Sequence, residues 1–241
     1  MSSLKITFRK TKQAIDLVLN DAFYRIVTYL LFLISRLLFR VRIYGREKPL
    51  NWRKQHHLPF VVVARHKSYW DIPFLPVAFG PSLKNRLKYV AKNELKVFFQ
   101  LIPLSNNFII YIDRDNPKKS TIEEIIKTLK DGNNVAIFPE GTTVPENKKF
   151  FGGIILVVKK VEQMTGQEIP IFALNVKTKG PYGKPKGKWY YYLSRMVEAD
   201  LRIGGPIFYR DLEKVVKNKE LTKAQKRAVM VEELLRKVDQ I

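Results

Sequence analysis

The spacing of hydrophobic and polar positions along this chain changes near residue 59. From there on, short runs of β-branched and aromatic residues alternate with longer segments whose apolar positions recur at helical spacing. The expected strands are 59–64, 87–91, 108–112, 134–138 and 169–175, with later strands within 188–200 and 202–209. Several of these runs are apolar throughout, which is typical of strands that are buried on both faces. The pattern therefore predicts an α/β fold with a mostly parallel central sheet and helices on both faces.

The segments between the strands carry signals for helix ends. Residues 121–130 are preceded by Ser120 and contain Glu123, a spacing that predicts a capping box. Asp131 and Gly132 then supply a stop. Two further helices are expected on the same grounds, at 154–165 and in a C-terminal segment opened by Thr222 and Gln225.

The first 46 residues differ from the rest, because they hold nine basic residues against two acidic ones. Two helices are expected there, at 4–19 and 22–39, with a break at residues 20–21. The second contains an uncharged run between Arg25 and Arg36. That run is ten residues long, about half of the ~20 that a membrane-spanning helix needs. The segment is therefore expected not to cross a bilayer.

A pair of apolar helices flanked by arginines is typical of an element that lies among lipid headgroups with its apolar face in the acyl chains. We interpret residues 1–46 as a two-helix membrane anchor and residues 47–241 as the α/β domain. The alternative is a helical hairpin that is buried against the main domain.

The charge balance of 44 Lys and Arg against 22 Asp and Glu gives a net charge of +22. Such a field attracts nucleic acid, anionic lipids or phosphorylated substrates, unless it is simply a solvated surface. No nucleic-acid-binding motif is present, and the cations are not interleaved with aromatic residues in an obvious strip. We therefore expect an anionic membrane surface as partner and no nucleic acid.

Metal and thiol chemistry are not expected. The chain has no cysteine, which excludes disulfides, a thiol nucleophile and cysteine-based metal sites. His56 and His57 have no acid at metal-ligand spacing and are interpreted as surface residues.

Two strand ends carry residues that are suited to catalysis. His66 and Asp71 follow the strand expected at 59–64. Asp71 can accept a hydrogen bond from one imidazole nitrogen, and the other nitrogen can then take a proton from a substrate hydroxyl. Residues 138–142 (FPEGT) follow another buried strand and place an acid where open α/β sheets bind ligands. A packed histidine, a helix-capping aspartate and an ordinary turn are the alternatives.

Together the motifs resemble those of the glycerolipid acyltransferase family, especially the bacterial 1-acylglycerol-3-phosphate acyltransferases. His66 and Asp71 match its H-x4-D block, and 138–142 matches a second block downstream. Between them, residues 91–95 (AKNEL) and 111–114 (YIDR) are similar to further blocks of the family, as is 169–171 (IPI) after them. The resemblance covers roughly residues 58–175.

The resemblance implies an acyl transfer in phospholipid biosynthesis. His66 would deprotonate the acceptor hydroxyl and Asp71 would orient the imidazole. The acceptor would then attack the thioester of acyl-CoA or acyl carrier protein, at the cytoplasmic face of the cell membrane, making phosphatidic acid without a metal or other cofactor. The residues implied to bind the lysophospholipid acceptor are Lys92, Arg114, Glu140, Gly141 and Thr142.

This sequence departs from the family pattern at two positions. The family usually has glycine where this chain has Phe108, and arginine where it has Thr143. Loss of that arginine removes a bidentate phosphate donor, which lysine replaces imperfectly. Another lysophospholipid or a lyso-aminolipid is therefore the alternative acceptor, and a non-catalytic basic membrane- or nucleic-acid-binding protein is a remote alternative function.

Overall fold

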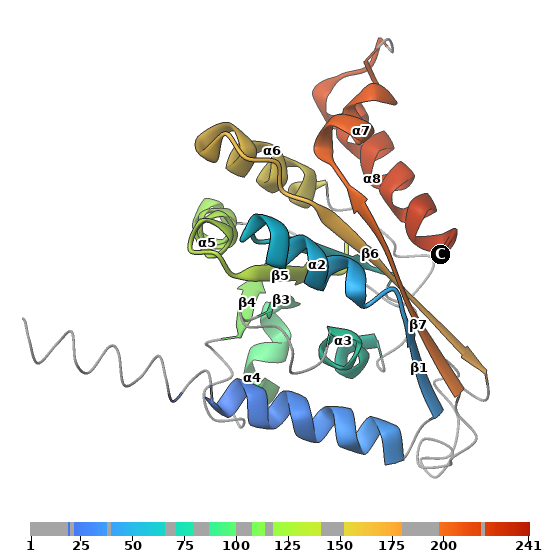
Figure 1. The fold of residues 1–241 in the computed structure, drawn as a ribbon. Coiled ribbons are helices and arrows are strands. Elements are labelled where there is room, and N and C mark those ends of the chain that lie inside the picture. The colour runs from blue at the N-terminus through green and yellow to red at the C-terminus, as the bar shows by residue number, and fades with distance from the viewer. Residues whose placement is uncertain are drawn as a thin grey trace, which may run out of the picture.

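The computed structural model describes residues 19, 22–37, 40–65, 71–79, 87–99, 108–113, 118–140, 152–179, 198–217 and 220–241. Residues 22–37 are helical and precede the labelled elements in Figure 1. The strands are β1 (Arg40–Tyr44), β2 (Val61–Ala64), β3 (Leu87–Lys92), β4 (Ile109–Ile112), β5 (Asn134–Ile137), β6 (Ile171–Lys179) and β7 (Glu198–Ile207). The helices are α2 (Glu47–His56), α3 (Asp71–Phe79), the 3-10 turn η1 (Asn93–Leu95), α4 (Lys96–Phe99), α5 (Lys119–Lys130), α6 (Gly153–Thr165), α7 (Tyr209–Lys214) and α8 (Lys223–Asp239).

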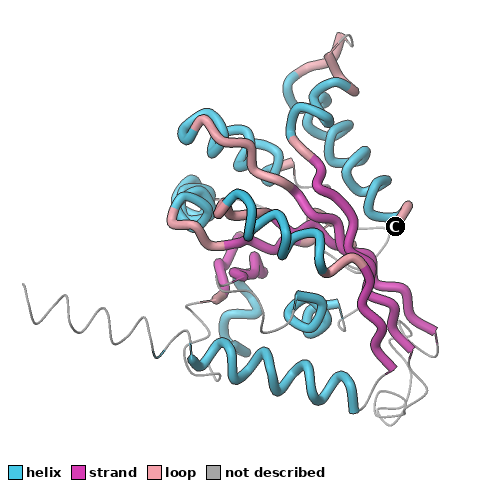
Figure 2. Tube along the Cα trace, in the orientation of Figure 1, coloured by secondary structure: helices cyan, strands magenta, loops and turns pink. Residues whose placement is uncertain are grey.

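The described strands form one twisted sheet in the order β1-β7-β6-β2-β5-β3-β4 (Figure 2). Neighbours pair in parallel except β6 and β7, which are antiparallel. The prediction of a mostly parallel sheet is thus confirmed. The apolar runs at 61–64 and 135–137 are buried at every position, because helices cover both faces of the sheet at these strands.

Alternate residues of the central strands β2, β5 and β6 pack in two separate cores. Val61 and Val63 of β2 pack in one core with α5, α6, α7 and α8. Phe60, Val62 and Ala64 point to the other face, into a core shared with α3. Figure 1 shows α6, α7 and α8 on one side of the sheet, and α3 and the helix at 22–37 on the other.

Most of the expected elements are present. Each strand expected at or before 169–175 has its counterpart, and β7 occupies most of the strand expected within 202–209. It also includes the last residues of the segment 188–200, of which 188–197 lie outside the described residues. The helix expected at 154–165 is confirmed as α6, and Thr222 caps α8 in a capping box with Gln225. The expected helix 4–19 and the break at residues 20–21 lie outside the described residues, apart from Leu19.

The capping box expected at Ser120 and Glu123 is wrong. Helix α5 starts at Lys119 after Lys118, and no side chain caps it. Ser120 therefore lies inside the helix, where its hydroxyl cannot serve as the N-cap acceptor. The stop is confirmed, because Gly132 has a φ of 78° just beyond the helix.

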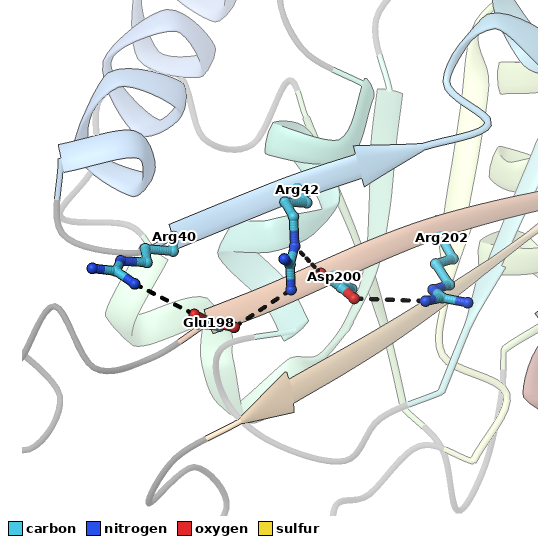
Figure 3. A network of polar contacts seen from close by, with 5 residues as sticks. All are labelled: Arg40, Arg42, Glu198, Asp200 and Arg202. Carbon is cyan, nitrogen blue, oxygen red and sulfur yellow. Dashed lines mark hydrogen bonds and ion pairs between the residues drawn. The ribbon is translucent and has the colours of Figure 1, made fainter.

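Strand β1 was not expected, because residues 40–46 were interpreted as part of the N-terminal membrane anchor. The strand pairs in parallel with β7, and ion pairs reinforce the pairing (Figure 3). Arg42 Nε lies 2.7 Å from Asp200 Oδ1, and Arg40 lies 3.6 Å from Glu198. The hydrogen bond from Arg42 lowers the pKa of Asp200. The arginines of the edge strand β1 thus form ion pairs with acids of its neighbour β7.

The helix at 22–37 packs on the domain through an unusual set of residues. Tyr24, Thr28 and Ser35 are buried, although two of them are small and polar. The Tyr24 ring lies 5.0 Å from that of Phe108, and its hydroxyl accepts a hydrogen bond from Leu87 N–H at 3.4 Å. None of the described helices is both long and apolar enough to cross a bilayer.

Candidate active site

The carboxyl ends of four neighbouring parallel strands lie along one edge of the sheet. In spatial order these are β2, β5, β3 and β4. Ligands of open α/β folds bind outside this edge. Four of the motifs singled out in the sequence follow or end one of these strands: His66 follows β2, Glu140 follows β5, Lys92 ends β3 and Arg114 follows β4. The fifth motif, residues 169–171, stands instead at the start of β6.

Three of the expected site residues are described. Asp71 lies in the first turn of α3 and is 1% exposed. A carboxylate is favoured there, because the positive end of the helix dipole is nearby. Glu140 is fully buried. Lys92 keeps its side chain about half-exposed and makes a loose contact of 3.7 Å with the exposed Glu94, so its ammonium group is accessible to an anion.

The remaining expected site residues lie outside the described part of the chain. These are His66, Arg114, Gly141 and Thr142. Their roles stay predictions, as do those of Asp71, Lys92 and Glu140.

Arg65 lies directly after β2, at the same edge of the sheet, and was not expected from the sequence to belong to the site. Its guanidinium donates through Nη1 to Glu140 Oε1. It also donates through Nε to both carboxylate oxygens of Asp239, at 3.2 and 3.1 Å. One side chain thus joins the ends of β2 and β5 to the end of α8. Its position directly before His66 could have indicated a role in the site. No pattern of neighbouring residues predicts its pairing with Asp239, 174 positions away.

The ion pairs of Arg65 stabilise a buried charge. Desolvation by itself would lower the pKa of Arg65, but the hydrogen bonds and charges of Asp239 and Glu140 outweigh it and the pKa is raised. Arg65 therefore stays charged at every physiological pH. A buried carboxylate such as Glu140 needs such a partner, because an uncompensated charge in the protein interior is costly.

No metal site is apparent in the described ranges, where no group of three His, Cys, Asp or Glu residues could hold an ion. The interpretation of His56 and His57 as surface residues is confirmed, since both are exposed. His56 stacks on Trp52 with ring centroids 3.8 Å apart.

The Acyltransferase family profile matches residues 40–177, more than half of the chain. The chain belongs to the acyltransferase family. The match begins at the first residue of β1 and ends within β6.

Two individual acyltransferases are similar to this chain. The 1-acyl-sn-glycerol-3-phosphate acyltransferase of Bacillus subtilis (strain 168) is 30% identical over 126 residues, which cover 49% of this chain. The chain spans about half, 56%, of that relative's length. The crystal structure of the 1-acyl-sn-glycerophosphate (LPA) acyltransferase PlsC from Thermotoga maritima matches with a TM-score of 0.50 and 21% identity, over 96% of this chain and 82% of that one. This match supports the α/β acyltransferase fold.

Replacing Arg65 by methionine is expected to destabilise the acyltransferase fold by about 2 kcal/mol or more, because it removes the cation from a buried carboxylate. The measurement is the free energy of unfolding from denaturant titration. The matched control is Arg236→Met, because the Arg236 side chain is 56% exposed against 19% for Arg65, and its partner Glu233 keeps Lys237 as a second cation. Only a small loss is therefore expected for the control. Equal losses in the two variants would contradict a special role for Arg65.

Proposed function

We propose that this chain transfers a fatty acyl group from acyl-CoA or acyl carrier protein to the free hydroxyl of 1-acylglycerol-3-phosphate, which yields phosphatidic acid. The observation that carries the proposal is the position of the H-x4-D and FPEGT motifs. They follow β2 and β5, which are adjacent and parallel, in a member of the acyltransferase family. The name of the Bacillus subtilis relative supports the choice of acceptor.

In this mechanism His66 takes the proton from the acceptor hydroxyl as the oxygen attacks the thioester carbonyl. The new ester bond forms, the carbon–sulfur bond breaks, and the imidazolium returns its proton to the leaving thiolate. Asp71 orients the imidazole and stabilises its charged form. Its burial in the first turn of α3, five residues after His66, supports this role. No acyl-enzyme is needed, and the chain has neither a cysteine nor a G-x-S-x-G motif.

We propose that Lys92 and Arg114 bind the phosphate of the acceptor. The walls of the acceptor site are formed by Glu140, Gly141 and Thr142. The accessible ammonium group of Lys92 supports this, since it stands at the end of the strand next to β5. Glu140 is tied to Arg65, so its carboxylate shapes the site rather than exchanging protons with substrate. Thr143 in place of the family arginine favours a second candidate acceptor, another lysophospholipid or a lyso-aminolipid.

The direct test is thiol release from palmitoyl-CoA and from palmitoyl-acyl carrier protein, with 1-acylglycerol-3-phosphate presented in vesicles. His66→Ala is expected to lower acceptor-dependent release about 10²–10⁴-fold, the usual share of a general base. His56→Ala is the control, because His56 is an exposed histidine on α2. Wild-type activity in the His66 variant would overturn the mechanism.

We further propose that the helix at 22–37 holds the enzyme in the headgroup layer of the membrane, at its cytoplasmic face. The helix is amphipathic, but its apolar side faces solvent instead of the protein core. The exposed apolar residues are Ile26, Tyr29, Leu30, Leu33, Ile34 and Leu37. Soluble proteins rarely leave so contiguous an apolar stripe uncovered, and an interfacial helix requires one. Arg25 and Arg36 lie near its ends, where headgroup phosphates would meet them.

Placing a charge on this stripe tests the attachment. Leu30→Glu is expected to weaken flotation with anionic vesicles at least about tenfold, since it replaces an apolar side chain in the acyl layer by an ion. Met164→Glu is the matched control: Met164 is an exposed apolar residue on α6, with 53% exposure against 50% for Leu30. If both variants float equally well, the helix at 22–37 is not the attachment site.

A further inference from the structure

A cleft of about 780 Å³ lies between α6, α7 and α8. Its floor is apolar, with Ile155 from α6, Val216 after α7 and Met230 from α8. These three side chains are at most 5% exposed and belong to the core on that side of the sheet. The helix at 22–37 lies on the opposite side of the sheet (Figure 1). The cleft is therefore separate from the proposed membrane surface.

The walls of the cleft are basic. Among the described lining residues there are seven lysines and arginines and one acid, Glu213. The cations come from all three helices and the turn after α7: Lys159, Arg210, Lys214, Lys217, Lys223, Lys226 and Arg227.

Some of these cations have acidic partners and some do not. Lys159, Arg210 and Lys214 each form an ion pair, with Glu213, Glu168 and Asp211 respectively. No ion pair with a described residue is found for Lys217, Lys223, Lys226 or Arg227, which gather where the turn after α7 faces the start of α8.

The cations of α8 repel one another. Lys223 lies three positions before Lys226 and four before Arg227. Like charges at these spacings share one helix face and destabilise the helix. Arg227 Nε donates a hydrogen bond to the Lys223 carbonyl oxygen at 3.2 Å, but this contact does not offset the repulsion between the charges. An anionic partner would offset it.

The position of the cleft narrows the choice of partner. A protein that lies on the bilayer through the helix at 22–37 turns the cleft towards water, so lipid headgroups cannot fill it. An apolar floor between two basic walls matches an amphipathic helix whose apolar ridge is flanked by carboxylates. We propose that this cleft docks an acidic helix of the soluble carrier protein that delivers the acyl thioester. The inference rests on the proposed acyl transfer and selects its donor.

Helix α8 links the cleft to the proposed active site. Met230 lines the cleft, and Asp239, nine residues later, pairs with Arg65 beside His66. Nine residues of α-helix span roughly 14 Å. A phosphopantetheine arm is about as long as four or five extended residues, which also reach roughly 14–17 Å. A carrier protein held at the cleft can thus present its thioester at the strand ends.

The test is the binding of fluorescently labelled holo-acyl carrier protein to the full chain, by anisotropy at low salt in zwitterionic micelles. The double variant Lys223→Glu/Lys226→Glu is expected to raise Kd at least about tenfold, since opposed charges meet at the docking surface. The control is Lys127→Glu/Lys130→Glu on α5, with the same spacing and charge change outside the cleft. No binding by the wild type, or equal losses in both variants, would overturn the proposal.

Kinetics with two donors then separate the possible occupants. The cleft variant is expected to raise KM for palmitoyl-acyl carrier protein and to leave palmitoyl-CoA turnover within about twofold of wild type, because only the carrier has a protein surface to dock. A rise confined to the CoA donor would show that the cleft binds nucleotide phosphates, and would overturn the proposal. Since anisotropy needs no turnover, a catalytically inactive protein that still binds the carrier would refute the proposed function alone.

Discussion

The parallel pairing of β2 with β5 is the constraint on which the rest of the structure depends. Its register sets Val61 opposite Val135 and Val63 opposite Ile137, so the two strands end within one residue of each other. The H-x4-D and FPEGT motifs, about seventy positions apart, thereby start from neighbouring points on one edge. Arg65 then clamps this edge by binding Glu140 after β5 and Asp239 of α8. The core strands, the candidate site and the last helix are therefore held together at one place.

The basic residues of this chain fall into groups with different physical roles. Arg40 and Arg42 pair with acids of β7 and secure the sheet edge. Arg65 neutralises a buried carboxylate. The cations at the start of α8 have a different character, because they crowd together without acidic partners among the described residues. The net charge of +22 is therefore made up of groups with different roles. The positions of the basic residues say more about function than their number.

Local patterns predicted the central strands and the helices α5, α6 and α8, since burial on both faces, the helical spacing of apolar residues and the capping box of α8 all depend on residues close in sequence. They failed where distant contacts decide. Strand β1 reads as alternating arginine and apolar residues, and its acidic partners lie 158 positions away. Helix α3 contains Pro76 and is stabilised by its buried Phe74, Leu75 and Phe79 rather than by helix propensity. The bulky Phe108, at a position where the family usually has glycine, packs against Tyr24 and so helps to seat the helix at 22–37.

We propose that the strand-end site acylates 1-acylglycerol-3-phosphate. The most direct test offers a deuterated palmitoyl donor together with equal amounts of 1-acylglycerol-3-phosphate, lysophosphatidylethanolamine and a lyso-aminolipid, and identifies the products by mass spectrometry. We expect the label to accumulate mainly in phosphatidic acid. Label that enters one of the other lipids, while 1-acylglycerol-3-phosphate is left unchanged, would contradict this assignment of the acceptor.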